Sequence, residues 1–462
     1  MAQSTRSPVA RQLEHLRHRF AQQTGLPFAD LLPDDTPQLL QADTDDPIYT
    51  PLVTLGLFLA QVLDPNGSCR QAVARLLAQR SAQGLSPCSA NTGAYCKARQ
   101  RLPEEGLQTL TRRTGATLSG KTPDRWQWKG RRVRVADGTT LNAPDTPDNQ
   151  RQYPQTDGQK PGLGFPIIRL VVLFCLATGA VLEAALAPYQ GKGTGELSLL
   201  RQLWHALAPG DVLLGDRIFC SYFEIVLLNR RGVDVVLHKH QSRRTDFRTG
   251  RRSGRFDHVI EWKKPLRPDW MDEAVYRQLP STMSLREVRL EVSVRGFRVR
   301  RYELITTLTD PHQFPVAELG QLYRRRWEGE LNLRCLKTSM GLEQLSCKSP
   351  EMVRKELWVY LLSYNLVRGV MAESAAVAGV APRFLSFAGA MQSVCAFGEL
   401  WSFEVGASVA SSLARLWAAV GTHRVGNRPD RVEPRAIKRR KKDFPQLKEP
   451  RKHAQQRLLL SA

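Results

Sequence analysis

The chain has 462 residues, of which 42% are hydrophobic and 24% are charged, a composition typical of a globular protein with sizeable cores. Lys and Arg number 67 against 44 Asp and Glu, which gives a formal net charge of +23. A field of this sign favours polyanionic partners, nucleic acid first and an anionic membrane second. The same numbers argue against collagen, a disordered tail protein and an integral membrane protein.

The cysteines and the apolar segments narrow the class further. Eight cysteines are scattered without a C-x-x-C pair, so we expect neither a zinc site nor a disulfide framework. The longest apolar stretch, residues 167–187, contains Arg169 and Glu183 and is expected to form buried strands rather than a membrane span. The polar, basic N-terminus has no signal-peptide core. We therefore expect a cytoplasmic, nucleoid-associated bacterial protein.

Most of the excess charge lies in two blocks. Residues 424–462 carry 13 Lys and Arg against 4 acids, and residues 238–305 carry 17 against 9. The first block also contains four prolines and is predicted to be an extended or disordered arm. Contact with a nucleic-acid backbone is favoured over a merely solvated tail and loop, because the charge is concentrated.

The first 125 residues are predicted to be helical. Apolar periodicity and turn signals predict helices over 9–22, 50–63, 69–81 and 89–102. The last two resemble a helix-turn-helix, and Arg99 and Arg101 on the second helix are candidate DNA contacts. A solvated helix pair with no role in binding is the alternative.

From Trp126 onward, strands alternate with helices, an order that indicates an α/β domain. Strands are predicted over 132–136, 166–175, 180–187, 211–214, 233–238 and 302–308. Helices are predicted over 196–207, 222–229, 315–340 and 350–373, with more helix between 382 and 420. The basic block between the last two strands is expected to be mostly β. We divide the chain into domains at 1–125, 126–238, 239–305, 306–423 and 424–462.

Two acids and one helix face are the candidates for chemistry. Asp137 and Asp216 follow predicted strands, where α/β folds commonly open into a crevice, although each could be an ordinary turn residue. On a helix of about 100° per residue, one arc of about 60° holds a phenol, a guanidinium, a carboxylate and an ammonium. These belong to Tyr323, Arg326, Glu330 and Lys337. Such a row can contact a phosphate and a metal together, whereas Arg326 and Glu330 alone would be a common surface pair.

This row, Y-x-x-R-x-x-x-E-x-x-x-x-x-x-K, is similar to the signature of bacterial insertion-sequence transposases of the IS-four type. The blocks V-A-D-G-T-T-L at 135–141 and G-D-R-I-F-C at 215–220 resemble the same family. The resemblance covers most of the chain. It implies a ribonuclease-H-like catalytic core with a β-rich insertion, a helical N-terminal DNA-binding domain and a helical C-terminal part with a basic tail. It also implies a catalytic triad of Asp137, Asp216 and Glu330.

The resemblance further implies how such a triad acts. The three acids would hold two Mg²⁺ ions about 3.5–4 Å apart, for which Mn²⁺ can substitute, while Tyr323, Arg326 and Lys337 would clamp phosphates. Water would free a 3′-OH at the end of the element, and a DNA hairpin would precede strand transfer in a cut-and-paste route. The partners would be terminal inverted repeats and target duplex DNA, held by a homodimer.

A DNA hairpin requires a flipped base, and a flipped base stacks on an aromatic side chain. Trp327, Trp262 and Trp270 are the candidates, with ordinary packing as the alternative for each. Trp262 is favoured because two lysines follow it.

Two other functions stay open. One is a DNA-binding protein without catalysis, and the other is a sequence-tolerant ribonuclease-H-like nuclease. The presence of all three acids and the full helical row favours the active transposase over the first. A requirement for specific terminal repeats would separate it from the second.

Overall fold

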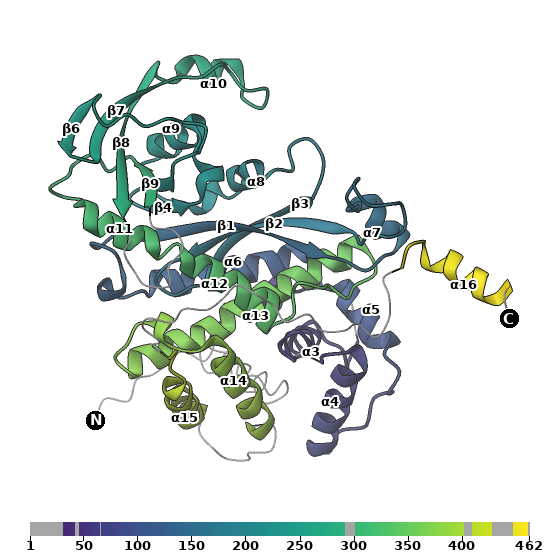
Figure 1. Ribbon diagram of the computed structural model, residues 1–462. Coiled ribbons are helices and arrows are strands. Elements are labelled where there is room, and N and C mark those ends of the chain that lie inside the picture. Colours follow the sequence, from purple (N-terminus) through teal and green to yellow (C-terminus); the bar gives the residue numbers. More distant parts are fainter. Residues whose placement is uncertain are drawn as a thin grey trace, which may run out of the picture. The chain divides into compact units, whose positions relative to one another are not determined.

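The computed structural model describes residues 31–41, 46–64, 66–291, 301–401, 409–426 and 447–460 (Figure 1). The helix predicted at 9–22 lies outside these residues. The described chain forms two compact units. The first draws its residues from 1–126, 177–183 and 331–425, and the second draws its residues from 127–176, 184–330 and 426–462. The N-terminal helices therefore share a unit with the helices that follow Glu330.

The first unit is helical and is organised around α13 (Pro350–Val377). Ser349 caps this helix by accepting a hydrogen bond from the Met352 N–H, and a proline fills the first helical position. The predicted helices over 50–63, 69–81 and 350–373 are confirmed. The other helices of this unit are α2 (Thr36–Leu39), α3 (Pro51–Leu63), α4 (Cys69–Ala82), α5 (Gly93–Arg101), α6 (Glu104–Gly120), α14 (Phe387–Trp401) and α15 (Val409–Thr422).

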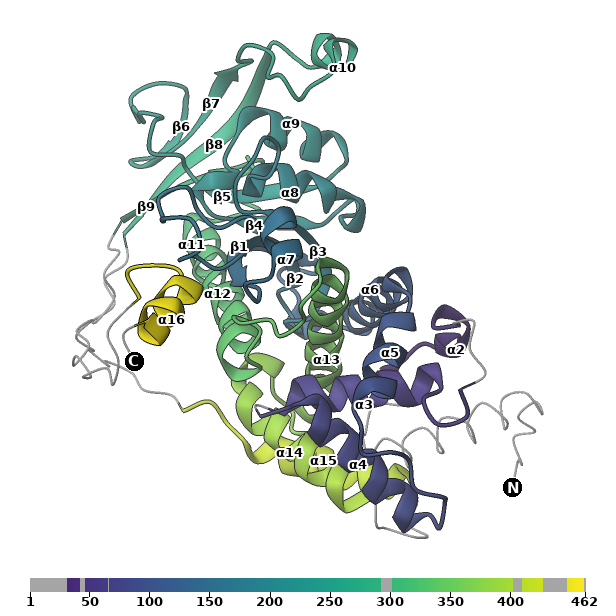
Figure 2. The ribbon, with the colours of Figure 1, turned by 90° about the vertical axis from the view of Figure 1, so that its right-hand side faces the viewer.

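A buried amide ties α13 to its neighbours. Figure 2 shows α6 beside α13, and Asn365 of α13 donates to the Thr111 carbonyl of α6 at 3.1 Å. The same side chain accepts from the Val181 N–H at 2.7 Å and donates to the Val181 carbonyl at 2.8 Å. Because one amide satisfies buried main-chain groups of a helix and a strand, residues 177–183 belong with these helices.

Arg99 is a core residue, and the structure corrects its prediction as a DNA contact. Its side chain is only 7% exposed, and its guanidinium lies 4.7 Å from the ring centre of Phe58 and 5.1 Å from that of Tyr95. Aromatic faces attract a cation held in this way, so α5 turns Arg99 inward. Arg101 lies closer to the surface and pairs with Asp46 at 3.1 Å.

The second unit is built on a nine-stranded mixed sheet with the order β3-β2-β1-β4-β5-β9-β8-β7-β6. β1 is antiparallel to β2 and parallel to β4, and β4 is parallel to β5. The predicted α/β class and the strands up to 238 are confirmed, but β1 continues through Asp137 instead of ending at Ala136. The strands are β1 (Val133–Asn142), β2 (Ile167–Cys175), β3 (Val181–Pro188), β4 (Val212–Gly215), β5 (Asp234–His238), β6 (Arg251–Gly254), β7 (Asp257–Lys263), β8 (Thr282–Glu291) and β9 (Arg301–Thr306).

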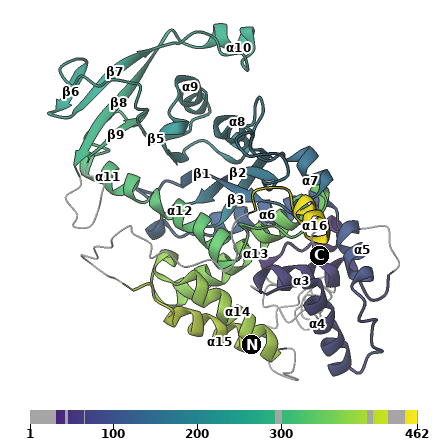
Figure 3. The same cartoon turned by 45° about the vertical axis from the view of Figure 1, so that its right-hand side comes forward.

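The basic block at 238–305 extends this sheet. β9 pairs with β5, and β8, β7 and β6 follow in that order toward the edge. Two helices, α8 and α9, lie on one face of the β1–β5 part of the sheet, and α11 lies on the other (Figure 3). The described part of the tail contains a helix rather than an extended arm. The helices that lie in or begin in this unit are α7 (Pro147–Gln152), α8 (Glu196–Gln202), α9 (Tyr222–Arg230), α10 (Glu273–Gln278), α11 (Val316–Arg324), α12 (Trp327–Arg334) and α16 (Arg451–Leu460).

Among the helices of the described ranges, none is both long enough and apolar enough to cross a membrane.

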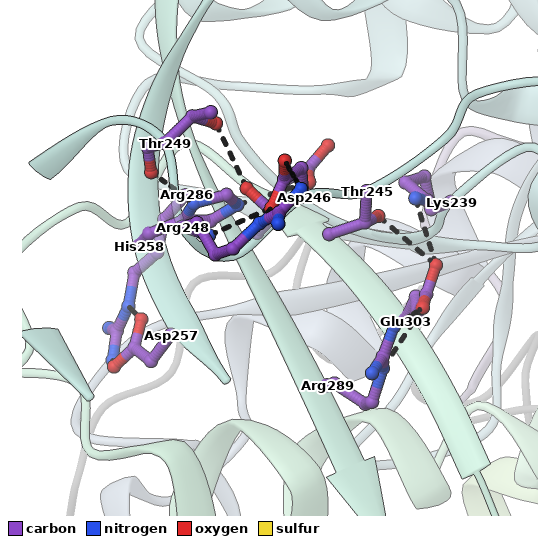
Figure 4. Close-up of polar contacts among 11 residues, drawn as sticks. Lys239, Thr245, Asp246, Arg248, Thr249, Asp257, His258, Arg286, Arg289 and Glu303 are labelled. Carbon is purple, nitrogen blue, oxygen red and sulfur yellow. Dashed lines mark hydrogen bonds and ion pairs between the residues drawn. The ribbon is translucent and has the colours of Figure 1, made fainter. Parts of the chain in front are cut away.

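A buried arginine organises the extension of the sheet (Figure 4). Arg286 on β8 is 0% exposed, and its Nε and Nη2 atoms each donate to the Asp257 carboxylate at 2.7 Å. Its Nη1 atom donates to the Phe314 carbonyl at 2.7 Å. The two-pronged contact fixes the orientation of the guanidinium, and the Phe314 contact holds the segment that leads into α11.

We expect Arg286→Met to lower the free energy of unfolding of the full chain by about 3–5 kcal/mol, because the Asp257 carboxylate would be left buried without its cation. Urea denaturation followed by circular dichroism measures this. Arg277→Met is the control: its pair with Glu273 is exposed, and its loss should cost less than about 1 kcal/mol. An equal, small loss in both variants would contradict the prediction.

Candidate active site

Strand register brings the two aspartates to one level of the sheet. Val133 of β1 pairs with Val212 of β4, an offset of 79 residues, and the same offset leads from Asp137 to Asp216. The parallel pairing stops at Val135, so β1 has no strand partner beside Asp137 on that edge among the described residues. Parallel strands that end in this way open a crevice at their carboxyl ends.

Asp216 stands where β4 ends and a short 3₁₀ helix, Arg217–Phe219, begins. Its carboxylate accepts a hydrogen bond from the N–H of the next residue, Arg217, at 2.6 Å, at the start of that turn. His238, at the end of β5, places its Nδ1 atom 3.9 Å from the same carboxylate. Asp216 is therefore held by its own turn and faces the next parallel strand.

The prediction of one uninterrupted helix over 315–340 is wrong. α11 ends at Arg324 and α12 begins at Trp327. Tighter hydrogen bonds close the turn between them, from the Arg326 N–H to the Tyr323 carbonyl (3.0 Å) and from the Gly329 N–H to the Arg326 carbonyl (2.9 Å). The break matters because it changes the direction of the chain between α11 and α12, just before Glu330.

Gly329 allows the first turn of α12 to approach β1 closely. A Cβ built on Gly329 would fall 2.7 Å from Cγ1 of Val135 and 3.9 Å from Cβ of Asp137. The first distance is shorter than any real Cβ contact, so only glycine fits without displacement. The next residue, Glu330, therefore lies close enough to Asp137 for its charge to act on that carboxyl.

Arg326 links Glu330 to a cluster of aromatic rings. Its Nη2 atom donates to Oε1 of Glu330 at 2.7 Å, and its guanidinium lies 5.8 Å from the ring centre of Tyr323. The rings of Tyr323, Tyr302 and His238 contact one another edge-on, with centres 5.7–6.2 Å apart. Burial raises the pKa of Tyr323, so its phenol stays protonated at neutral pH.

The acids of this region act on one another. Burial raises the pKa of Asp137 to about 6; Arg326 and the Gly138 N–H oppose the rise, whereas Glu330 and Glu196 add to it. Burial also raises the pKa of Glu196, against the effect of Arg169, and Asp216 adds to that rise. Four carboxylates thus share one electrostatic environment.

The chemistry of these side chains fits a hard divalent cation. Asp137 is half-buried and lies near other carboxylates, and such a cation would relieve their repulsion through the oxygen ligands that it prefers. Within the described ranges, no three His, Cys, Asp or Glu side chains converge closely enough to hold an ion as they stand. Each triad acid has an oxygen engaged by a protein donor, namely Gly138, Arg217 and Arg326. Metal binding would therefore require these side chains to reorient.

The other predicted site residues are placed differently. Trp262 is 5% exposed, and the guanidinium of Arg243 lies 3.6 Å from its ring centre, so the structure corrects its prediction as a stacking surface. Arg201 covers Trp270 in the same way at 3.7 Å. Trp327 is 48% exposed at the start of α12. Lys337 belongs to the first unit, where its Nζ atom lies 3.6 Å from Glu343.

Sequence reasoning missed Glu196. The pattern at 196–207 predicts a helix, and Glu196 was interpreted only as its first residue. In the structure its carboxylate lies against the backbone of Gly138, next to Asp137. An acid at the start of the first helix after the β2–β3 hairpin is the available signal, but only the packing of α8 on the sheet brings it near Asp137.

The chain is similar in sequence to known transposases. Residues 128–366, just over half of the chain, match a family model described as a transposase DDE domain. The transposase InsG for insertion sequence element IS4 of Escherichia coli (strain K12) is 31% identical over 304 residues, which span 64% of each protein. The putative transposase InsZ of the same organism is 26% identical over 140 residues, 30% of this chain and 46% of that protein.

A cryo-EM structure of a piggyBac transposase synaptic complex with hairpin DNA is 10% identical and covers 87% of this chain and 84% of its own, with a TM-score of 0.44. That value is too low for this neighbour to bear on the fold.

The residues that match the family model include Asp137 of β1, Asp216 at the end of β4 and Glu330 of α12. The chain belongs to the DDE transposase family. Its match to InsG spans less than two thirds of that protein.

We expect Gly329→Ala to lower the free energy of unfolding by about 1–3 kcal/mol, because the added methyl overlaps Val135. The double variant Gly329→Ala/Val135→Ala should lose less stability than the sum of the losses in the two single variants, since the two changes compensate in volume. Denaturation of the two single variants and the double variant measures the coupling. Strictly additive effects would contradict the close contact.

We expect the contribution of Asp137 to the stability of the metal-free protein to fall as the pH rises from about 4 to about 6. The folded-state pKa of Asp137, about 6, exceeds its ordinary value of 3.8, so the folded state binds this proton more tightly and its loss costs up to about 3 kcal/mol. Asp137→Asn should therefore be more stable than the parent at pH 7.5, but not at pH 4. Denaturation in a chelating buffer at both pH values tests this, and a pH-independent difference would contradict it.

Proposed function

We propose that the protein is an insertion-sequence transposase that cuts and joins DNA strands through Asp137, Asp216 and Glu330. The observation that carries the proposal is where the fold puts the three acids: the offset of 79 residues sets the two aspartates at one level of the sheet, and Gly329, the residue before Glu330, lies against Val135 and Asp137. The strand order β3-β2-β1-β4-β5, with β1, β4 and β5 parallel, supports the ribonuclease-H-like core that the family resemblance implies.

The three acids are proposed to hold Mg²⁺, as two ions for which Mn²⁺ can substitute. Bound there, the metal supplies Lewis-acid stabilisation of the charge that develops on the attacking and leaving oxygens. Asp137 is the central ligand, since it adjoins Glu330 on one side and is aligned with Asp216 on the other. The buried ring of Tyr323 orients Arg326, because the guanidinium lies over the face of that ring.

Arg326 is proposed to exchange partners on loading. In the metal-free site its guanidinium pairs with Glu330 at 2.7 Å. If Glu330 held the metal, Arg326 would be available to a phosphate of the scissile strand, which a guanidinium binds with two parallel hydrogen bonds. Lys337, the last residue of the family signature, is proposed to contact a neighbouring phosphate.

Duplex DNA, as terminal inverted repeats and as target, is the proposed substrate, and a homodimer would hold the two ends. Arg251 and Arg252 on β6 are exposed and suit backbone contact. The N-terminal helices are proposed to bind DNA through exposed groups such as Lys97, in place of the buried Arg99. Trp327, which is 48% exposed, is proposed to stack a flipped base in a hairpin route, and Trp270, which is 43% exposed, is the second candidate. Association with the nucleoid follows from this substrate.

We expect Asp137→Asn, Asp216→Asn and Glu330→Gln each to keep affinity for the element's terminal repeats and to lower Mg²⁺-dependent cleavage at least about 10³-fold, equivalent to about 4 kcal/mol of activation free energy. Glu328→Gln is the matched control, because Glu328 lies on the same helix and pairs with Arg325 at 2.9 Å. Cleavage of labelled duplexes and a gel-shift assay measure the two properties.

Each other outcome of this experiment has a distinct meaning. Full cleavage by any of the three variants would exclude that acid from the triad. If the parent protein bound DNA but never nicked it, with or without Mg²⁺, the protein would be a binding protein. Equal cleavage of duplexes with and without the repeats would indicate a nuclease.

A further inference from the structure

A glycine on β1 makes room for an acid from the opposite face of the sheet. The side chains of Val135 and Asp137 face α12, because Gly329 approaches both of them. Side chains alternate along a strand, so residue 138 faces α8. A Cβ on Gly138 would fall 2.6 Å from Cδ of Glu196 and 2.9 Å from each of its carboxylate oxygens. The carboxylate therefore occupies the place where a side chain would be.

The Glu196 carboxylate is influenced by the charge of Arg169 but makes no direct contact with it. No hydrogen bond or ion pair to Glu196 is found among the described residues, and the nearby Arg169 donates instead to the Thr194 carbonyl at 2.9 Å. The half-buried carboxylate adjoins Asp137, and its charge is opposed by that of Asp216. A half-buried acid next to other acids and without a donor is costly unless a cation joins it.

The edge of β1 connects the two faces at this point. β4 stops pairing with β1 at Val135, so no described strand separates Glu196 from the triad beside Asp137 and Gly138. We propose that Glu196 is a fourth carboxylate of the metal site, which binds the ion held by Asp137 and Asp216 directly or through a metal-bound water. This inference rests on the proposed function, since it takes the triad as the metal ligands.

The alternative role for Glu196 is local. An acid in the first turn of a helix stabilises it by about 0.3–1 kcal/mol through the helix dipole, and Glu196 is the first residue of α8. Glu273 is the first residue of α10 and is exposed in an ion pair with Arg267, so Glu273→Gln is a matched control for this role. The two roles predict different effects on metal affinity.

The test measures Mn²⁺ binding to the full chain by calorimetry and thermal unfolding in a chelating buffer. Glu196→Gln should weaken Mn²⁺ binding about 10-fold or more, as is typical when a supporting carboxylate is lost. It should not lower the metal-free melting temperature, because it removes repulsion. Glu273→Gln should leave Mn²⁺ binding unchanged. Parental affinity in Glu196→Gln, or a lower melting temperature as its only effect, would overturn the proposal.

A second variant tests the geometry. Gly138→Ala puts a methyl where the Glu196 carboxylate lies, and that flexible side chain can swing away without unfolding the protein. It should weaken Mn²⁺ binding as much as Glu196→Gln does, and the double variant should lose no more than either single variant. Additive losses would show that the two residues act independently and would overturn the inference.

Asp137→Asn keeps this result separate from the proposed function. If Asp137→Asn abolishes Mn²⁺ binding and DNA cleavage while Glu196→Gln behaves like the parent, only the fourth carboxylate is wrong. If Asp137→Asn binds Mn²⁺ and cleaves normally, the triad itself is wrong.

Discussion

The site depends on how closely neighbouring elements approach β1. Two glycines control that approach from opposite faces: Gly329 lets α12 reach Val135, and Gly138 leaves space for a carboxylate from α8. Neither glycine has a left-handed backbone that would demand it, since neither is among the residues with positive φ. Their requirement is steric. A single methyl at either position would displace an acid. The spacing of the carboxylates therefore depends on the lack of a side chain at both glycines.

The acids gathered there make the site unfavourable without a cation. The pKa of Asp137 is raised to about 6 by burial and by its carboxylate neighbours, although Arg326 lies close by. Arg326 is itself engaged by Glu330, so one guanidinium offsets several acids only in part. The divalent ion that we propose there would relieve this repulsion, and its binding would be favoured at a pH where the carboxylates have lost their protons.

The sequence predicted what depends on periodicity and on order along the chain. The strands on either side of Asp137 and Asp216, the β2–β3 hairpin and helix α13 follow from local patterns, and the offset between the aspartates turned out to be the register of β1 against β4. Side-chain direction was harder to predict. Arg99 and Trp262 sit in segments rich in basic residues and were assigned to DNA, yet aromatic and guanidinium contacts bury both. The break between α11 and α12 at Arg325 could not be predicted from the sequence, because every residue there is compatible with a continuous helix.

Those burials change what the net charge of +23 means. Arg286 is enclosed with Asp257, and Lys239 and Arg289 both pair with Glu303, so part of the basic block at 238–305 holds the sheet extension together (Figure 4). An arginine or lysine that is paired inside the fold cannot contact DNA phosphates and release their counterions. Arg286 nevertheless serves the site, because its bond to Phe314 fixes the segment that leads into α11 and hence toward Glu330. Arg286 is therefore a structural cation within the sheet, whereas Arg251 and Arg252 on its exposed edge are the arginines that we propose for DNA contact.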